Sequence, residues 1–125
     1  LVRPDRVIAV DALSAREAAR LCRAVQITDA GIVPGSGVGN ARSALTEETL
    51  GVPVVAVGVP TVVDARTLCA DLSGAEIDLP EDTELFVTPR DIDTRVRDSA
   101  RLVGYAIDLA LHDALTIEDI DMFLA

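Results

Sequence analysis

Short apolar runs alternate with helix-forming segments along this chain of 125 residues. Aliphatic and β-branched side chains fill three runs, at residues 6–10 (apolar after Arg6), 25–28 and 52–59. Such runs are typical of strands buried on both faces of a parallel sheet. Since strands and helices follow one another in turn, the pattern predicts an α/β fold, a three-layer sandwich with a parallel sheet between helices.

Capping residues indicate where the first two helices begin. Ser14 and Glu17 have the spacing of a capping box, which predicts a helix from Ser14 to about Arg23. Residues 46–50 are expected to form one helical turn that ends near Gly51.

A third helix is expected after the apolar run at residues 52–59. Pro60 and Thr61 would open this helix, which extends to about Leu72, and Asp64 would lie in its first turn, where a negative charge favours the helix dipole. The acidic stretch at residues 73–84 is expected to form an exposed connection.

The longest helix is expected to start at Thr88 as N-cap, with Pro89 in the first helical position. Apolar residues then recur every three or four positions, at Ile92, Val96, Ala100, Val103, Ile107 and Leu111. Thr116 is expected to cap a short last helix.

Three strands, beside four helices and the single helical turn at residues 46–50, make a thin sheet for a chain that is half apolar. We therefore interpret residues 1–125 as the C-terminal part of a single larger α/β domain. The sequence does not begin with Met and opens just before a strand, so we expect part of any active site to lie outside it. Aromatic residues make up 2% of the chain, which predicts an aliphatic core.

The formal net charge of −10 argues against nucleic-acid binding, because that function requires a basic surface. The acidity is compatible with a basic protein partner, or simply with solubility. No apolar run reaches the length of a membrane span, and no signal peptide is visible. We therefore expect a cytoplasmic protein with neither nucleic-acid nor membrane partners.

Two cysteines, Cys22 and Cys69, lie far apart within helix-like patterns. The chain has no Cys-x-x-Cys pair and one histidine, His112, so neither a metal site nor a cofactor is expected. This spacing is typical of reduced thiols packed within helices. Neither cysteine has a histidine near it in the sequence, so neither is a candidate nucleophile.

Asp11 is the first candidate for chemistry, because it directly follows the predicted strand at residues 6–10. Ligands of open α/β sheets bind at the carboxyl ends of the strands, so we expect the Asp11 carboxylate at that edge. A carboxylate in such surroundings suits general acid–base catalysis. Asp11 could equally cap the next helix or pair with Arg16.

A glycine-rich segment at residues 27–40 is the second candidate. Its four glycines let the backbone approach another group closely, but their spacing differs from the dinucleotide-binding GxGxxG motif. Ser36 has no adjacent histidine to activate it, because His112 ends a helix. Asp29 begins an Asp-Ala-Gly sequence that resembles the Asp-Thr-Gly of pepsin-like proteases, but those enzymes are all-β.

Five blocks of sequence resemble the germination protease family, in order, along nearly the whole chain. They are residues 3–13, 29–40, 49–65, 86–101 and 115–121. The resemblance implies an aspartic-type endopeptidase that degrades small acid-soluble spore proteins during spore germination. It also implies a zymogen, a homo-oligomer in the full-length enzyme, a place in the cytoplasm of the forespore or spore core, and a fold similar to hydrogenase-maturation proteases.

The resemblance implies catalysis by two aspartates and assigns one of them to Asp11, within Val-Asp-Ala-Leu. The other belongs to an earlier Asp-Ala-Leu-Gly-Pro motif that is absent here, since Ser14 follows the Asp-Ala-Leu of this chain. Ala30 and Val33 replace a threonine and a histidine that are usual in the family. The substrate-binding or active-site loop implied by the glycine block includes Asp29, Gly35, Ser36, Gly37 and Asn40.

Two alternatives stay open beside the aspartic protease. One is a hydrogenase-maturation-like protease that uses a metal bound to its substrate, which a single histidine at a helix end does not favour. The other is an inactive fragment or module that keeps the substrate groove. Because one of the two implied aspartates is absent, we expect the isolated chain to be inactive.

Overall fold

A computed structural model describes residues 2–75, 78–80 and 83–124. Contacts divide the chain into two compact units, Leu1–Arg90 (unit 1) and Asp91–Ala125 (unit 2). The strands of the described residues all belong to unit 1, and unit 2 contains two helices.

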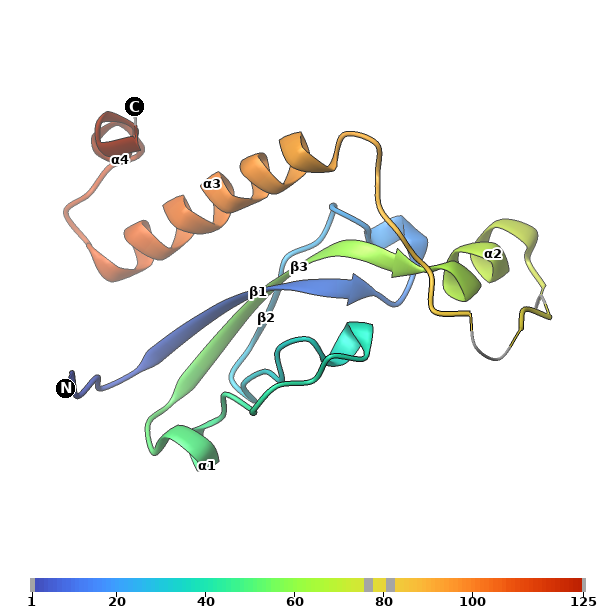
Figure 1. The fold of residues 1–125 in the computed structure, drawn as a ribbon. Helices are drawn as coiled ribbons and strands as arrows, with labels where there is room; N and C mark the ends of the chain where they lie inside the picture. Colours follow the sequence, from blue (N-terminus) through green and yellow to red (C-terminus); the bar gives the residue numbers. More distant parts are fainter. Residues whose placement is uncertain (1, 76–77, 81–82, 125) are drawn as a thin grey trace. The chain divides into compact units, whose positions relative to one another are not determined.

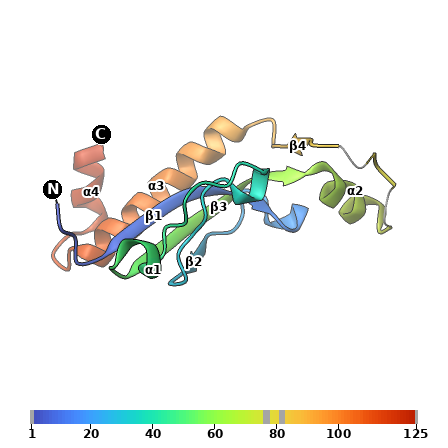
Figure 2. The same ribbon diagram turned by 60° about the horizontal axis from the view of Figure 1, so that its bottom comes forward.

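The sheet of unit 1 is built around one long central strand. β1 (Val7–Ala15) and β3 (Val54–Asp64) run parallel and lie side by side with their arrowheads pointing the same way (Figures 1 and 2). β2 (Gln26–Thr28) and β4 (Phe86–Val87) both pair antiparallel with β3. The prediction of a purely parallel sheet is therefore wrong: the fold is α/β, with an open sheet of four strands of mixed direction.

β1 and β3 both continue past the points where the sequence pattern ends them. The register pairs Leu13 with Pro60 and Ser14 with Val62, so Thr61 is passed over as a β-bulge. A proline offers no backbone N–H to a ladder and is tolerated in a sheet at such an irregularity. Pairing across the bulge holds both strands extended, so neither expected helix begins where its capping signal lies.

The capping box expected after the first strand does not form. Ser14 belongs to β1, and the next element is the short 3₁₀ helix η1 (Ala18–Arg20), whose N-cap residue Glu17 makes no side-chain capping hydrogen bond. Cys22 lies in the turn that follows, not in a helix, and has a left-handed φ of 54°. Its N–H donates to the Pro60 carbonyl at 2.7 Å, which fastens this turn to β3.

The third predicted helix forms as α2 (Ala65–Ser73), which contains Cys69. Asp64 is its N-cap and not a residue of its first turn: the Oδ1 atom accepts hydrogen bonds from the N–H groups of Arg66 at 2.8 Å and Thr67 at 3.4 Å. The connection expected at residues 73–84 lies partly outside the described residues, and its described part is mostly exposed.

The predicted helical turn at residues 46–50 is confirmed as α1 (Glu47–Leu50). Thr46 and Thr49 cap each other reciprocally, and Gly51 ends the turn in a left-handed conformation with φ 73°. Threonine therefore supplies here both halves of a motif whose second half is usually Glu or Gln.

The core of unit 1 is aliphatic, as predicted, and is centred on β3. Because β3 is flanked by strands on both sides, most of its side chains are buried. The buried apolar residues of unit 1 among those described are Ala15, Val54, Ala56, Val57, Val59, Pro60, Val63 and Ala65.

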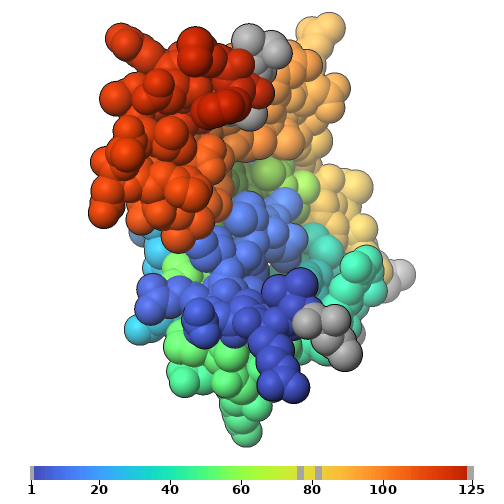
Figure 3. Space-filling view, turned by 90° about the vertical axis from the view of Figure 1, so that its left-hand side faces the viewer, coloured from blue at the N-terminus to red at the C-terminus, as the bar shows by residue number. Residues whose placement is uncertain are grey.

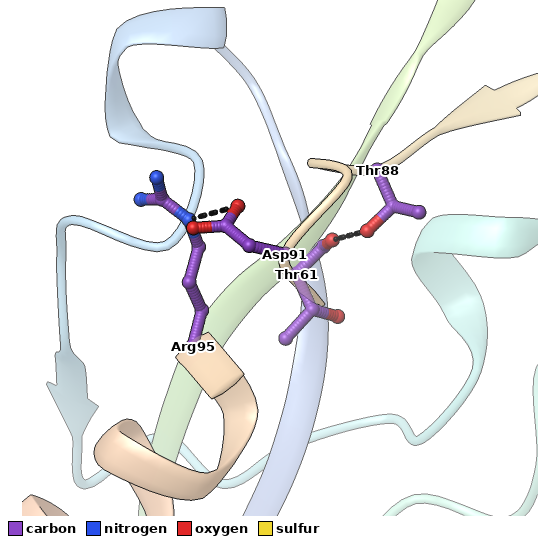
Figure 4. A network of polar contacts seen from close by, with 4 residues as sticks. All are labelled: Thr61, Thr88, Asp91 and Arg95. Carbon is purple, nitrogen blue, oxygen red and sulfur yellow. Dashed lines mark hydrogen bonds and ion pairs between the residues drawn. The ribbon is translucent and has the colours of Figure 1, made fainter. Parts of the chain in front are cut away.

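The long helix of unit 2, α3 (Ile92–Leu111), begins later than the sequence indicates. Its N-cap is Asp91, whose carboxylate accepts a hydrogen bond from the Arg95 side chain at 2.8 Å (Figure 4). Thr88, the expected N-cap, belongs to unit 1, where its hydroxyl donates to the Thr61 carbonyl at 2.9 Å. The bulge leaves that carbonyl available, so Thr88 supports β3 and does not cap a helix.

The last helix, α4 (Ile117–Leu124), begins after Thr116, as predicted. The Thr116 hydroxyl accepts from the Asp119 N–H at 3.2 Å, and the Asp119 carboxylate accepts in return from the Thr116 N–H at 2.9 Å. Val103 of α3 and Ile120 of α4 are the buried apolar residues of this unit among those described. No helix in the described part of the chain combines the length and apolarity needed to cross a membrane.

Candidate functional site

A cavity of about 230 Å³ lies where β1 meets the glycine segment. The segment between β2 and α1 runs out toward the carboxyl end of β1 and then returns to α1 (Figure 1). The residues that line the cavity are Asp11, Ala12, Leu13, Ser14, Arg16, Gln26, Ile32, Val33, Gly35, Ser36, Gly37 and Val38. Two regions selected from the sequence, the Asp11 strand and the glycine segment, therefore meet at one site.

Asp11 lies inside β1 and not at its carboxyl end, which corrects the prediction. It pairs in register with Gly58, and the strand continues for four more residues. Its Oδ1 atom accepts a hydrogen bond from the Ala12 N–H at 2.9 Å. Neither structural alternative holds among the described residues, since Asp11 neither caps a helix nor pairs with Arg16, which lines the same cavity.

The glycine segment keeps its shape through its own backbone. Ile32 and Leu45 form a two-way bridge, with N–H···O distances of 3.0 and 2.8 Å. The 3₁₀ helix η2 (Ser36–Val38) then lies between Gly35 and Gly39, which both have left-handed φ values, of 76° and 70°. Glycine adopts these values without strain.

Two glycines permit the close approaches that form the cavity. A Cβ atom on Gly37 would lie 3.0 Å from the Cβ of Ser14, so the absence of a side chain lets η2 rest on β1. A Cβ atom on Gly58 would lie 2.3 Å from the Cδ1 of Leu13. The Leu13 side chain occupies that space and forms part of the cavity wall beside Asp11.

Two of the residues that the resemblance implies lie outside the cavity lining. Asp29 is exposed in the bend after β2, where the Thr28 hydroxyl accepts from the Ala30 N–H at 3.1 Å. Asn40 closes the loop by donating its N–H to the Gly35 carbonyl at 3.0 Å. Asn40 therefore shapes the glycine segment through its backbone, and its side chain does not line the cavity.

Sequence reasoning did not place Ala12, Leu13, Ser14 and Arg16 in the cavity, because it ended the first strand too early. It also missed Gln26, which lines the cavity from β2. The length of the third apolar run could have indicated that the first strand is longer than residues 6–10. A buried strand that continues to residue 63 needs a partner of similar length, and only an extension of β1 through Ser14 supplies one.

The described residues that line the cavity include one carboxylate, one guanidinium group and several neutral polar groups. Asp11 is the only carboxylate among its described lining residues, and Arg16 is the only cation. Ser14 and Ser36 contribute hydroxyls, but no histidine lines the cavity to activate them. No group of three or more metal-binding side chains exists among the described residues. The arrangement suits binding of a polar chain beside a single proton-accepting carboxylate.

Comparison with known proteins identifies the family. A family model described as germination protease matches residues 1–78, which include every residue of the cavity lining. The chain belongs to the germination protease family. A germination protease of Clostridium tetani is 37% identical over an alignment that covers 98% of this chain and 48% of that protein. A germination protease of Caldanaerobacter subterraneus subsp. tengcongensis is also 37% identical over the same shares.

The similarity to germination proteases is strongest over part of the chain. A germination protease of Bacillus pumilus is 61% identical over 69 residues, 55% of this chain and 19% of that protein. The chain spans about half the length of the curated relatives that it matches along its whole length. The implied likeness of the fold to hydrogenase-maturation proteases stays a prediction.

Proposed function

We propose that this chain forms part of an aspartic-type endopeptidase that degrades small acid-soluble spore proteins in the spore core during germination. The observation that carries the proposal is the position of Asp11. Among the described residues it is the one carboxylate that lines the cavity, and all of these lining residues lie within the part of the chain matched to the germination protease family.

The chemistry requires two carboxylates in different protonation states. The ionised one removes a proton from water as it attacks the scissile carbonyl, and the protonated one donates to the carbonyl oxygen or the leaving amine. When two carboxyl groups lie close together, their pKa values move apart, because the negative charge of the first disfavours ionisation of the second. Asp11 supplies one of the two, and the second comes from a part of the enzyme outside these 125 residues.

The glycine segment would bind the substrate next to Asp11. Gly35, Ser36 and Gly37 line the cavity and offer backbone and hydroxyl groups to a polypeptide. Asp29 and Asn40 belong to the same segment without lining the cavity, so their proposed part is to maintain the loop conformation. The full-length enzyme is expected to form homo-oligomers and to need no cofactor, nucleic acid or membrane.

A second candidate is a substrate-binding module without catalytic activity. The observation that favours it is the single carboxylate among the described lining residues, since one acid cannot fill both roles of the pair. Binding of spore proteins without turnover, by the protein at its natural length, would support this candidate over the protease.

The test is an assay of the protein isolated from its native source, with its intact mass measured. We expect a longer chain that cleaves a small acid-soluble spore protein, and Asp11→Asn should lower kcat by about a hundredfold or more. Asp5→Asn is the matched control, because Asp5 is exposed and lies before β1. We expect the 125-residue chain alone not to cleave the spore protein. If it does, and Asp11→Asn abolishes that cleavage, the two-aspartate proposal is contradicted. Cleavage that depends on nickel would instead favour the metal-dependent alternative.

A further inference from the structure

Arg16 carries a charge that the aspartate mechanism does not use. It is the only cation among the described residues that line the cavity, and Asp11 is the only carboxylate among them. Both residues lie in the described part of the chain and form no ion pair with each other, so their charged groups stand apart within one cavity. A substrate group that enters the cavity therefore meets a carboxylate and a guanidinium group together.

β1 fixes the backbone from which both side chains start. The strand pairs with β3 from its beginning, where blue atoms of β1 lie beside green atoms of β3 (Figure 3), to Ala15, which lies opposite Val63. Asp11 belongs to this ladder, and Arg16 directly follows the buried Ala15. At the rise of a strand, the α-carbons of Asp11 and Ala15 are about 13 Å apart, so the acid and the cation start from two separate points.

The turn that follows Arg16 is fastened to the rest of unit 1 at two points. The Asp71 carboxylate of α2 accepts a hydrogen bond from the Ala18 N–H at 2.6 Å, although 53 positions separate the two residues. Farther along the turn, the Cys22 N–H donates to the Pro60 carbonyl at 2.7 Å. Since the N-cap side chain of η1 makes no capping hydrogen bond, Asp71 supplies that contact from another helix.

Arg16 therefore lies between two fixed points, the paired end of β1 and the hydrogen bond from η1 to Asp71. A donor that is already in place stabilises a developing charge without a cost of reorganisation at the moment of reaction. A guanidinium group presents several N–H donors and keeps its own proton. Such a group suits an oxygen atom that becomes negatively charged during the reaction.

We propose that Arg16 donates hydrogen bonds to the carbonyl oxygen of the scissile peptide bond, and that Asp71 is the positioning residue that holds Arg16 for this contact. The proposal rests on the proposed function. The water that Asp11 activates lies within hydrogen-bond reach of that carboxylate, and the carbon under attack lies next to the water. The oxygen on that carbon gains negative charge, so the cation of the same cavity lowers the energy of the transition state.

Arg16 then changes what the second carboxyl group of the pair has to do. As the water oxygen bonds to the carbonyl carbon, Asp11 takes a proton from the water and the π electrons of the carbonyl move to its oxygen. Arg16 stabilises that negative oxygen and keeps its own proton. When the carbonyl bond forms again, the C–N bond breaks and the nitrogen takes a proton from the second carboxyl group. That carboxyl group is therefore left to serve the leaving amine.

The first test compares two neighbouring arginines in the protein at its natural length. Arg16→Gln removes the cation of the cavity, and Arg20→Gln is the matched control, because Arg20 lies in η1 and does not line the cavity. We expect Arg16→Gln to lower kcat about a hundredfold or more and to change KM less than about threefold, since the contact is strongest in the transition state. Arg16→Lys keeps the charge and should recover part of the loss, and Arg20→Gln should leave both constants unchanged.

The second test identifies the substrate atom that Arg16 contacts. Two inhibitors are built on a peptide that spans a cleavage site mapped by mass spectrometry in a small acid-soluble spore protein. One is a hydroxyethylene isostere, which carries an oxygen on the tetrahedral carbon, and the other is a reduced amide, which lacks that oxygen. We expect Arg16→Gln to weaken inhibition by the hydroxyethylene peptide about tenfold and to leave inhibition by the reduced amide unchanged.

The third test shows whether Asp71 acts through Arg16. Asp71→Ala removes the acceptor of the Ala18 N–H, whereas Asp71→Asn keeps an oxygen there. We expect Asp71→Ala to lower kcat about tenfold and Asp71→Asn to recover most of that loss. In the Arg16→Gln background, Asp71→Ala should lower kcat no further, because the residue that it positions is already gone. Melting temperatures of the same variants report stability separately.

The outcomes separate this inference from the proposed function. A normal kcat for Arg16→Gln overturns the role of Arg16 and leaves that of Asp11 intact. A raised KM at normal kcat, or equal losses for the two inhibitors, also overturns it, because Arg16 then contacts another part of the substrate or of the enzyme. A loss from Asp71→Ala that persists in the Arg16→Gln background overturns the positioning role. Failure of the natural-length protein to cleave any spore protein overturns both the inference and the proposed function.

Discussion

The two units of this chain are stabilised in different ways. Unit 1 packs a continuous aliphatic core around β3, and its strands pair residues far apart in the sequence. Unit 2 is a pair of helices with two buried apolar residues among those described, Val103 and Ile120. Surface contacts connect its two helices: the Tyr105 hydroxyl of α3 donates to the Asp121 carboxylate of α4, and Arg101 forms an ion pair with the same carboxylate at 3.5 Å.

This difference explains where the functional site lies. The cavity forms where the glycine segment packs against β1. A well-packed unit holds a loop and a strand at fixed positions relative to each other, which a site of this kind requires. The part matched by the family model, residues 1–78, falls within unit 1. Unit 2 leaves large apolar side chains more than a third exposed: Val96, Leu102, Leu109, Leu111, Ile117, Met122 and Phe123.

The largest expected contrast comes from removing an apolar side chain from each unit. Val54→Ala empties a site that is 2% exposed, so it should lower the free energy of unfolding by about 2–3 kcal/mol. Leu102→Ala, in unit 2, truncates a side chain that is 59% exposed and should cost less than about 0.5 kcal/mol. Urea unfolding of both variants measures the difference, and equal losses would contradict the comparison.

Glycine-to-alanine substitutions should have opposite signs in the two units. Gly58→Ala forces Leu13 out of its place and should destabilise unit 1 by about 1–3 kcal/mol, with reduced cleavage because Leu13 lines the cavity. Gly104→Ala, within α3, meets no atom within 4 Å and should stabilise the helix by about 0.5–1 kcal/mol. Thermal unfolding reports both signs; stabilisation by Gly58→Ala would show that the contact with Leu13 is not required.

Helix caps should matter more in unit 1 than at the start of α3. Asp64→Ala removes the acceptor for two backbone N–H groups of α2 and should cost about 1 kcal/mol. Asp91→Ala should cost less, because the Asp91 side chain makes no capping hydrogen bond. Asp64→Asn, which keeps a capping oxygen, is the control and should recover most of the loss in urea unfolding.

The smallest effect concerns acid pH and the start of α4. Hydrogen bonds from the Thr116 hydroxyl and N–H lower the pKa of Asp119 below its usual value. A lowered pKa in the folded state gives stability that is present above the unfolded pKa and is lost as the pH falls through the folded value. Amide signals at the start of α4 should therefore shift in NMR titration below about pH 4. Asp119→Asn should remove that shift, whereas Glu118→Gln should keep it.

Local patterns predicted the elements whose structure depends on near neighbours. The turn of α1, the presence of the long helix α3 and the Thr116 cap of α4 were predicted correctly, because the residues that determine them lie within a few positions. The apolar stripe of α3 is buried only in part, since Val96 and Leu111 are exposed. The aliphatic core also followed directly from composition.

The errors all arise where pairing between distant strands overrides a local signal. Ser14 has an ideal capping sequence but is held in β1 by Val62, and Thr88 bonds to Thr61 in place of its own helix. The same pairing placed Asp11 within a strand and not at its end. The sequence therefore indicated which residues meet at the cavity, Asp11 and Gly35–Gly37, but not the strand geometry that brings them together.

The bulge at Thr61 makes residue 61 a spacer that tolerates exchange but not loss. Its contribution to the network is a backbone carbonyl, so many side chains could stand there. Deleting the residue would instead shift the rest of β3 by one position. Because neighbouring side chains alternate between the two faces of a sheet, the side chains that follow would then point to the opposite face. Val63 would leave the core and Asp64 would leave the helix it caps. We therefore expect the amino acid at position 61 to vary among related proteins, while the number of residues in β3 stays the same.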